Sequence, residues 1–181
     1  MLLLTGVLVY LIVICRISFS LVFTLSFVNK VLHFGEFSRS LEGFRLVPPR
    51  SVRFATLLLM ASELSVVILL VVGSPFSEVG LLLALSLLLV FSGAITSAII
   101  RDINTSCNCF GPTTERISTY ELWRNGALLV CGLEGLTPMF MSGLVLRDFG
   151  FVEWLLMGLA AAVITVVLTN LRSIVQVFQM N

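Results

Sequence analysis

Residues 79–100 read VGLLLALSLLLVFSGAITSAII, and this stretch decides the fold class. It contains no charged residue, and it satisfies the requirement of about 20 apolar residues for a helix that crosses a lipid bilayer. Of the 181 residues in the chain, 58% are hydrophobic and only 12% are charged, and the mean hydropathy is +1.09. A soluble domain carries about 25% charged residues. The sequence therefore predicts an all-α integral membrane protein.

Four further apolar segments lie on either side of this run. With it they predict an antiparallel bundle of transmembrane helices, a four-helix core plus a fifth span, in one domain over residues 1–181. The expected spans are residues 1–28, 54–72, 79–100, 122–144 and 151–169. The segment 122–144 is the least clear because Glu134 and Pro138 interrupt it, so a count of four spans stays open. The first segment lacks the flanks of a secretory signal peptide, and we expect it to be retained.

The segment of residues 31–47 has a different composition, because it mixes charged with aromatic side chains. One helical face would carry the apolar residues at positions i, i+3, i+7 and i+10, which are Phe34, Phe37, Leu41 and Phe44. This spacing favours an amphipathic helix that lies in the headgroup plane. The alternative is a loop whose Phe side chains pack on the bundle.

The basic residues predict an orientation. With five spans, all of the 11 Lys and Arg residues except Arg16 and Arg147 fall on one side of the membrane. The positive-inside rule then places the N-terminus outside and residues 101–124 on the cytoplasmic side.

Two cysteines lie in the polar connection after residues 79–100. The local sequence is Cys107-Asn108-Cys109-Phe110-Gly111-Pro112. Thiols separated by one residue come within disulfide reach where the backbone turns, and Asn, Gly and Pro favour turns. Because so small a ring is strained, its disulfide favours exchange with other thiols over a structural role. The alternative is a pair of interfacial thiols in a tight turn. We expect no metal site, since zinc would require His33 and another remote ligand.

The other two cysteines, Cys15 and Cys131, are surrounded by Leu, Ile and Val. This setting favours small, buried apolar side chains. The functional alternative is that one of them relays electrons to the first cysteine pair, or that the two pair with each other.

Arg16 and Glu63 lie near the middle of their expected spans. Ionisable groups at that depth normally face a partner or a cavity. If the first two spans are antiparallel neighbours, we expect these side chains to pair with each other. Such a pair would fix the bundle or polarise a ligand such as a quinone head group.

A series of short motifs resembles the MauE branch of the MauE/DoxX membrane proteins over about residues 1–131. The motifs are Phe27-Val-Asn-Lys30, Arg45-Leu-Val-Pro-Pro-Arg50, Glu63, Cys107-Asn-Cys109-Phe110-Gly111 and Arg124-Asn125. The most specific part is Cys-x-Cys-Phe-Gly followed at a distance by Arg-Asn. Asn108 stands where the family commonly has Gly, which stiffens the turn and leaves both thiols in place.

The resemblance implies a redox-associated, multi-pass protein of the bacterial cytoplasmic membrane. In the family, MauE is required for methylamine utilisation, where it is linked to maturation and disulfide formation of the small subunit of methylamine dehydrogenase. We therefore expect Cys107 and Cys109 to cycle between dithiol and disulfide and to oxidise a thiol-containing or thioredoxin-like partner protein. The supporting residues would be Lys30, Phe110, Gly111, Arg124 and Asn125. The cofactor stays open, because a quinone is suggested only by analogy with four-helix membrane oxidases.

Two other functions remain open. A non-catalytic assembly or transport partner for a periplasmic protein would tolerate Cys-to-Ser substitution. A small transporter or channel around Arg16 and Glu63 would suffer more from Glu63→Gln than from loss of any cysteine. Nucleic-acid binding is not expected, because a net charge of +1 provides no basic field. One conflict stays open: the charge count places the Cys107 and Cys109 pair in the cytoplasm, where thiols are usually kept reduced.

Overall fold

The structure is a computed structural model, and it describes residues 2–73, 75–103, 117–137, 149–171 and 175. No strand occurs among these residues. The helices are α1 (Leu2–Leu32), α2 (Phe34–Gly43), the 3-10 helix η1 (Pro49–Ser51), α3 (Val52–Val72), α4 (Phe76–Ile100), α5 (Thr119–Gly135) and α7 (Phe151–Thr169). The all-α membrane fold class is confirmed.

Four segments in the described part of the chain are long and apolar enough to cross a membrane. They are Gly6–Leu32, Pro49–Val72, Phe76–Ile100 and Phe151–Thr169, so the protein is a multi-pass membrane protein. The expected fourth span at 122–144 corresponds to α5, which begins at Thr119 and ends at Gly135. Its 17 residues extend about 26 Å, less than a hydrocarbon core of about 30 Å. Residues 138–144 of the expected span lie outside the described residues, so a count of four holds for the described part of the chain and the fifth span stays a prediction.

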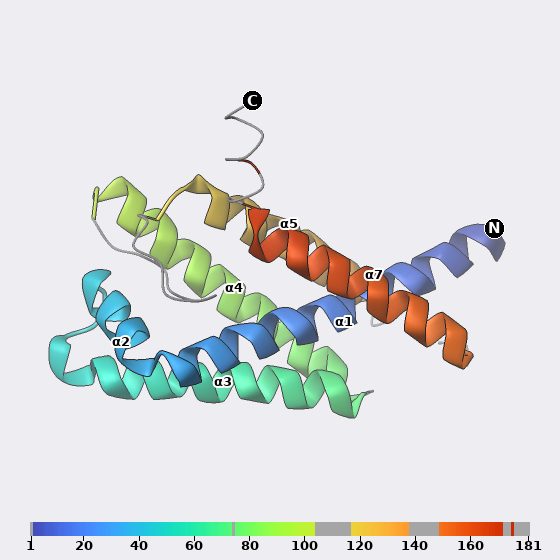
Figure 1. Cartoon of the computed structure of the whole chain (residues 1–181), viewed down its shortest axis with the longest axis horizontal. Helices are drawn as coiled ribbons and strands as arrows, with labels where there is room; N and C mark the ends of the chain where they lie inside the picture. The colour runs from blue at the N-terminus through green and yellow to red at the C-terminus, as the bar shows by residue number, and fades with distance from the viewer. Residues whose placement is uncertain (1, 74, 104–116, 138–148, 172–174, 176–181) are drawn as a thin grey trace.

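The long helices run alternately in opposite directions (Figure 1). α3 and α4 form a hairpin at Gly73, whose φ of +88° suits glycine. Near the other end of the bundle, Phe44 after α2, Ile95 and Ala98 of α4 and the flanking Ile103, Ile117 and Leu122 pack in one cluster. The C-terminal ends of α1 and α4 therefore lie with α2 and with the N-terminal ends of α3 and α5. We call this the α2 end.

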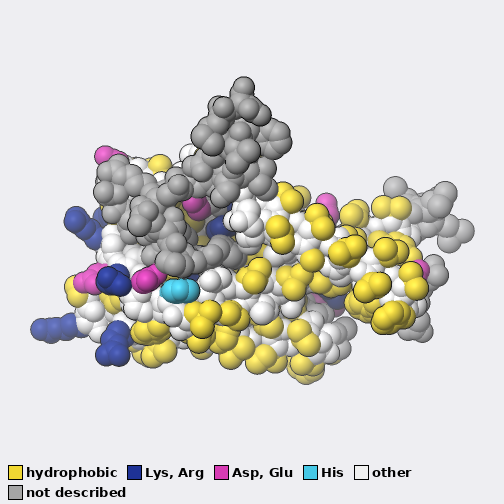
Figure 2. All heavy atoms as spheres, in the orientation of Figure 1, with side chains coloured by type: hydrophobic (Ala, Val, Ile, Leu, Met, Phe, Trp, Pro, Cys, Tyr) yellow, Lys and Arg dark blue, Asp and Glu magenta, His cyan; other side chains and the backbone are white. Residues whose placement is uncertain are grey.

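The surface separates charged from apolar side chains. Figure 2 shows Lys and Arg side chains gathered at the left, the α2 end, and hydrophobic side chains along much of the remaining surface. Exposed arginines at this end are Arg39, Arg45, Arg50 and Arg53. Along α3 and α7, large apolar side chains such as Leu58 and Leu159 are 60% and 63% exposed. Apolar side chains exposed in this number suit a surface surrounded by lipid.

Helix α2 lies within the segment where the sequence predicts an amphipathic helix. Its aromatic face is turned toward the protein: Phe37 is buried, Phe44 just after the helix is buried, and Phe34 is half-buried. Ser38 Oγ lies 3.2 Å from Thr56 Oγ1 of α3. The segment is thus helical, as expected, and its Phe side chains pack on the bundle, as the alternative held.

The contact between α7 and α1 includes one short polar link. Tyr10 of α1 donates a hydrogen bond from its hydroxyl to Glu153 Oε1 of α7 at 2.6 Å. This contact sets the first turn of α7 beside the N-terminal part of α1, at the end of the bundle opposite α2.

Removing this hydroxyl is expected to weaken the α1–α7 contact. Tyr10→Phe keeps the ring and deletes the donor, so the free energy of unfolding should fall by about 1 kcal/mol, as for other interhelical hydrogen bonds in membranes. SDS titration of the protein in mixed micelles measures this change. An unfolding free energy equal to that of the unsubstituted chain would show that the link adds nothing.

Candidate functional site

A buried ion pair joins α1 to α3. Lys30 Nζ lies 2.6 Å from Glu63 Oε1, and the two side chains are 0% and 1% exposed. Ser26 Oγ donates to the same carboxylate oxygen at 3.0 Å and accepts a hydrogen bond from Lys30 Nζ at 2.5 Å. The rings of Phe37 and Phe91 face the ammonium, with centroids 4.8 and 5.4 Å from Nζ. The cation is thus held by a carboxylate, a hydroxyl and two aromatic faces.

Helix periodicity explains the local arrangement. Ser26 and Lys30 are four residues apart on α1, so they lie one turn apart on one face. That face packs on α3 at Glu63. Burying two charges costs several kcal/mol per ion before their attraction offsets it. A membrane protein that keeps such a pair uses it for bundle specificity or for chemistry.

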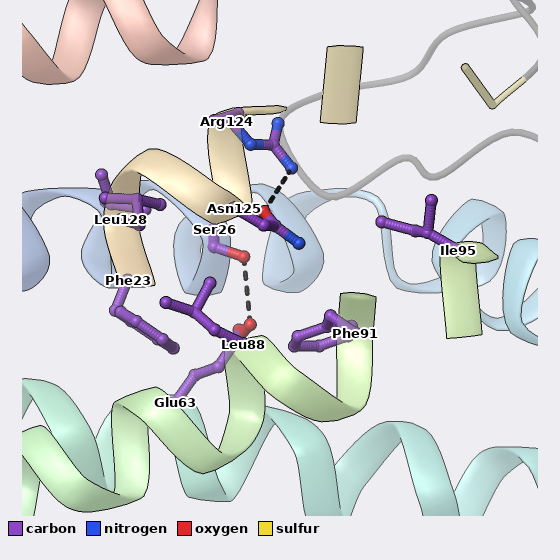
Figure 3. A pocket seen from close by; sticks show the side chains of 10 residues that line it. Phe23, Ser26, Glu63, Leu88, Phe91, Ile95, Arg124, Asn125 and Leu128 are labelled. Atoms are coloured by element: carbon purple, nitrogen blue, oxygen red, sulfur yellow. Dashed lines mark hydrogen bonds between the residues drawn. The ribbon is translucent and has the colours of Figure 1, made fainter. Parts of the chain in front are cut away.

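A small cavity lies beside this pair. Its volume is about 30 Å³, and its polar lining is Ser26, Glu63, Arg124 and Asn125. Apolar side chains, among them Phe23, Leu88, Phe91 and Leu128, complete the wall (Figure 3). The volume exceeds the roughly 10–15 Å³ that one water molecule needs. Glu63 Oε2 is buried and accepts no hydrogen bond from any residue that the structure describes. The site therefore offers a carboxylate oxygen to a small hydrogen-bond donor.

Helix α5 supplies the other polar groups. Asn125 is buried, donates from Nδ2 to Ser92 Oγ of α4 at 3.2 Å, and accepts at Oδ1 from Arg124 at 3.4 Å. Ser118 precedes the helix, and its backbone N–H and hydroxyl both donate to Glu121 at 2.9 Å. This capping box fixes the first turn of α5. The first turn of α5 thereby holds Arg124 and Asn125 next to the cavity.

The expected pairing of Arg16 with Glu63 is wrong, because Glu63 pairs with Lys30. Arg16 precedes Lys30 by four turns of α1, about 21 Å along the axis. It donates instead to the carbonyl oxygen of Gly135 at 3.4 Å and interacts electrostatically with Glu78 of α4. The physical reason is register: α1 continues to Leu32, so the last turns of α1 and not its middle lie level with Glu63.

Sequence motifs that are distant along the chain meet at this site. Lys30 and Glu63 form the ion pair. Glu63, Arg124 and Asn125 line the cavity beside it, so the site draws on three helices. Ser26 was not predicted. Its one signal in the sequence is the four-residue spacing from Lys30.

Cys107, Cys109, Phe110 and Gly111 lie outside the described residues, so their roles stay predictions. The flanking Ile103 and Ile117 are described, and both pack in the apolar cluster at the α2 end. The connection that carries the cysteine pair therefore leaves and rejoins the helices at that end. Among the residues described, no group of three or more His, Cys, Asp or Glu could hold a metal ion.

Comparison with known protein families gives a match. The family model described as MauE, methylamine utilisation protein MauE, matches residues 8–138. This range contains the Lys30–Glu63 pair, Arg124 and Asn125, and both cysteine pairs. No curated protein and no solved structure matches the chain.

Proposed function

The chain belongs to the MauE family of methylamine utilisation proteins, and on that premise we propose that it is a thiol–disulfide redox protein of the bacterial cytoplasmic membrane. One observation carries the proposal. Lys30, Glu63, Arg124 and Asn125 converge near the α2 end, where the connection bearing Cys107 and Cys109 joins the helices. Buried charged side chains near the α2 end are suited to assist thiol chemistry in the connection that carries Cys107 and Cys109.

The proposed reaction is thiol–disulfide exchange. A thiolate of the partner attacks one sulfur of the Cys107–Cys109 disulfide, forms a mixed disulfide and releases the other sulfur as a thiolate. A second partner thiol then displaces the mixed disulfide, so the partner gains a disulfide. The partner loses two electrons and two protons, and Cys107 and Cys109 gain them as two thiols. Reoxidation requires a two-electron acceptor, for which a membrane quinone is the chemical class suggested by analogy.

The buried cluster has a defined part in this proposal. Cationic side chains lower the energy of a nearby thiolate, and Lys30 and Arg124 are the cations beside the cavity. A carboxylate that accepts and returns a proton assists each exchange step, and Glu63 is the carboxylate in place. These are positioning and proton-transfer roles, and the covalent steps belong to the cysteines.

The partner we propose is a disulfide-rich exported protein, in methylamine-utilising bacteria the small subunit of methylamine dehydrogenase. The alternative is a non-catalytic assembly or transport partner for a periplasmic protein. This alternative function requires neither Cys107 nor Cys109, whereas thiol–disulfide exchange requires both thiols.

Substitution of the cysteine pair tests the proposal. Cys107→Ser and Cys109→Ser should each abolish disulfide formation in the partner while the protein stays in the membrane at its normal level. Asn108→Gly is the matched control, because it changes the same turn and keeps both thiols, and it should retain activity. Partner disulfides are counted by alkylation and mass spectrometry. Full partner oxidation by both Ser variants would favour the non-catalytic alternative.

Sidedness is tested by labelling in intact cells. In a chain with Cys15→Ser and Cys131→Ser, a membrane-impermeant maleimide should label Cys107 and Cys109 only after mild reduction. That result supports an oxidised pair facing the periplasm. Labelling that requires permeabilised cells would place the pair in the cytoplasm and contradict oxidation of exported proteins.

A further inference from the structure

A second pair of cysteines meets inside the bundle. Cys15 of α1 and Cys131 of α5 are far apart in the sequence, and their thiols lie close enough to interact with each other. Both are free thiols. Cys15 is 5% exposed, and Cys131 is partly buried. Neither belongs to the Lys30–Glu63 site.

The contact lies where α1 and α5 approach closely. Arg16, next to Cys15, donates to the carbonyl oxygen of Gly135, one turn beyond Cys131. A Cβ added at Gly132 would stand 2.9 Å from Phe19 Cζ of α1 and 2.5 Å from Leu85 Cδ2 of α4. A disulfide needs Cα atoms about 4.4–6.8 Å apart. Two helices reach that separation where a small residue such as Gly132 lies at the crossing.

We propose that Cys15 and Cys131 form a second dithiol–disulfide couple, whose oxidation links α1 covalently to α5. The two thiols lose two protons and two electrons as the S–S bond forms. The electron acceptor is a lipid-soluble quinone, which takes up the same two electrons and two protons and becomes a hydroquinone. Cys131 is the more accessible of the two residues, because it is only partly buried and lies on a helix that also exposes Val130 and Leu133.

This couple is separate from the cysteine pair of the proposed function. Cys131 follows Thr119 by just over three turns, which is about 18 Å along α5. The chain that carries Cys107 and Cys109 is anchored at the α2 end by Ile103 and Ile117. Exchange requires direct contact between sulfur atoms. We therefore assign Cys15 and Cys131 their own acceptor in the lipid.

The test uses the full chain in native membranes, with Cys107→Ser and Cys109→Ser so that Cys15 and Cys131 are the remaining thiols. After treatment, the protein is denatured and its free thiols are counted with a polyethylene glycol maleimide on a gel. Untreated protein should take up two maleimides. Protein treated with the thiol oxidant diamide should take up none, and dithiothreitol should restore both. In the same background, Cys131→Ser is the matched control and should keep its single reactive thiol after diamide.

Uptake of two maleimides after diamide would overturn the proposal, as would loss of both thiols through a disulfide-linked dimer on a non-reducing gel. Ubiquinone-1 in place of diamide tests the acceptor, and unchanged uptake of two maleimides would overturn the quinone assignment. After diamide treatment of the unsubstituted chain, mass spectrometry should find the peptides of Cys15 and Cys131 linked. This control does not depend on correct folding of the variant. Because the test does not use Cys107 or Cys109, its failure leaves the proposed function intact, and the reverse also holds.

Discussion

Lys30→Met and Glu63→Leu are each expected to lower the free energy of unfolding by about 3–5 kcal/mol. Each substitution removes one charge of an ion pair whose side chains are 0% and 1% exposed, and a buried charge without its counter-charge is strongly destabilising. Ser26 and the rings of Phe37 and Phe91 compensate for part of this loss only. SDS titration in mixed micelles measures both variants.

The double variant Lys30→Met, Glu63→Leu should be more stable than either single variant. It removes both charges and leaves apolar side chains of similar volume, which is often neutral in protein interiors. The non-additivity gives the coupling energy of the pair. Arg53→Met is the control, because Arg53 is exposed near the start of α3 and its loss should change stability by less than about 0.5 kcal/mol. Additive losses in the double variant would show that the two charges do not depend on each other.

The same double variant separates stability from chemistry. If the cluster serves thiol exchange, a folded protein without Lys30 and Glu63 should fail to form partner disulfides. If the double variant still forms partner disulfides, the role of the cluster is only structural, namely to hold α1 against α3. Activity of the single variants is not informative here, because each is expected to be unstable.

The fold class was predictable because the amino-acid composition alone indicates whether a chain is stable in a lipid bilayer or in water. A run such as residues 79–100 has no other stable environment than a membrane or a large core. The extent of α5 was less predictable. Its apolar stretch continues in the sequence, whereas the helix ends at Gly135, next to the exposed Glu134. Mean hydropathy over a long segment hides the effect of a single charged residue such as Glu134, so it does not predict where the helix ends.

The candidate site was predictable as a set of residues and not as a set of contacts. Lys30, Glu63, Arg124 and Asn125 all appear in the motifs, yet the partner of Glu63 depends on the register between α1 and α3. Nearly every position on these helices is apolar, so periodicity fixes neither rotation nor register. The role of Ser26 was hidden for a related reason. Serines on membrane helices commonly bond to their own backbone, as Ser65 and Ser86 do here.

Gly80→Ala is expected to lower the free energy of unfolding by about 1–3 kcal/mol, because α3 and α4 touch at this position. The added Cβ would stand 2.8 Å from Leu69 Cβ and 3.3 Å from the backbone nitrogen of Leu70. Neither atom is the mobile end of a side chain. Relief of the clash therefore requires α3 to move away from α4, and the contacts along the hairpin loosen with it.

Gly93→Ala on the same helix is the matched control. A Cβ there meets no atom within 4 Å, and the residue is exposed. The substitution should leave stability unchanged or raise it by up to about 1 kcal/mol through lower backbone entropy in the unfolded chain. Since both variants add one methyl group to α4, the difference between their unfolding free energies in the SDS titration reports the helix contact alone. Equal values for the two variants would contradict a close crossing of α3 and α4 at Gly80.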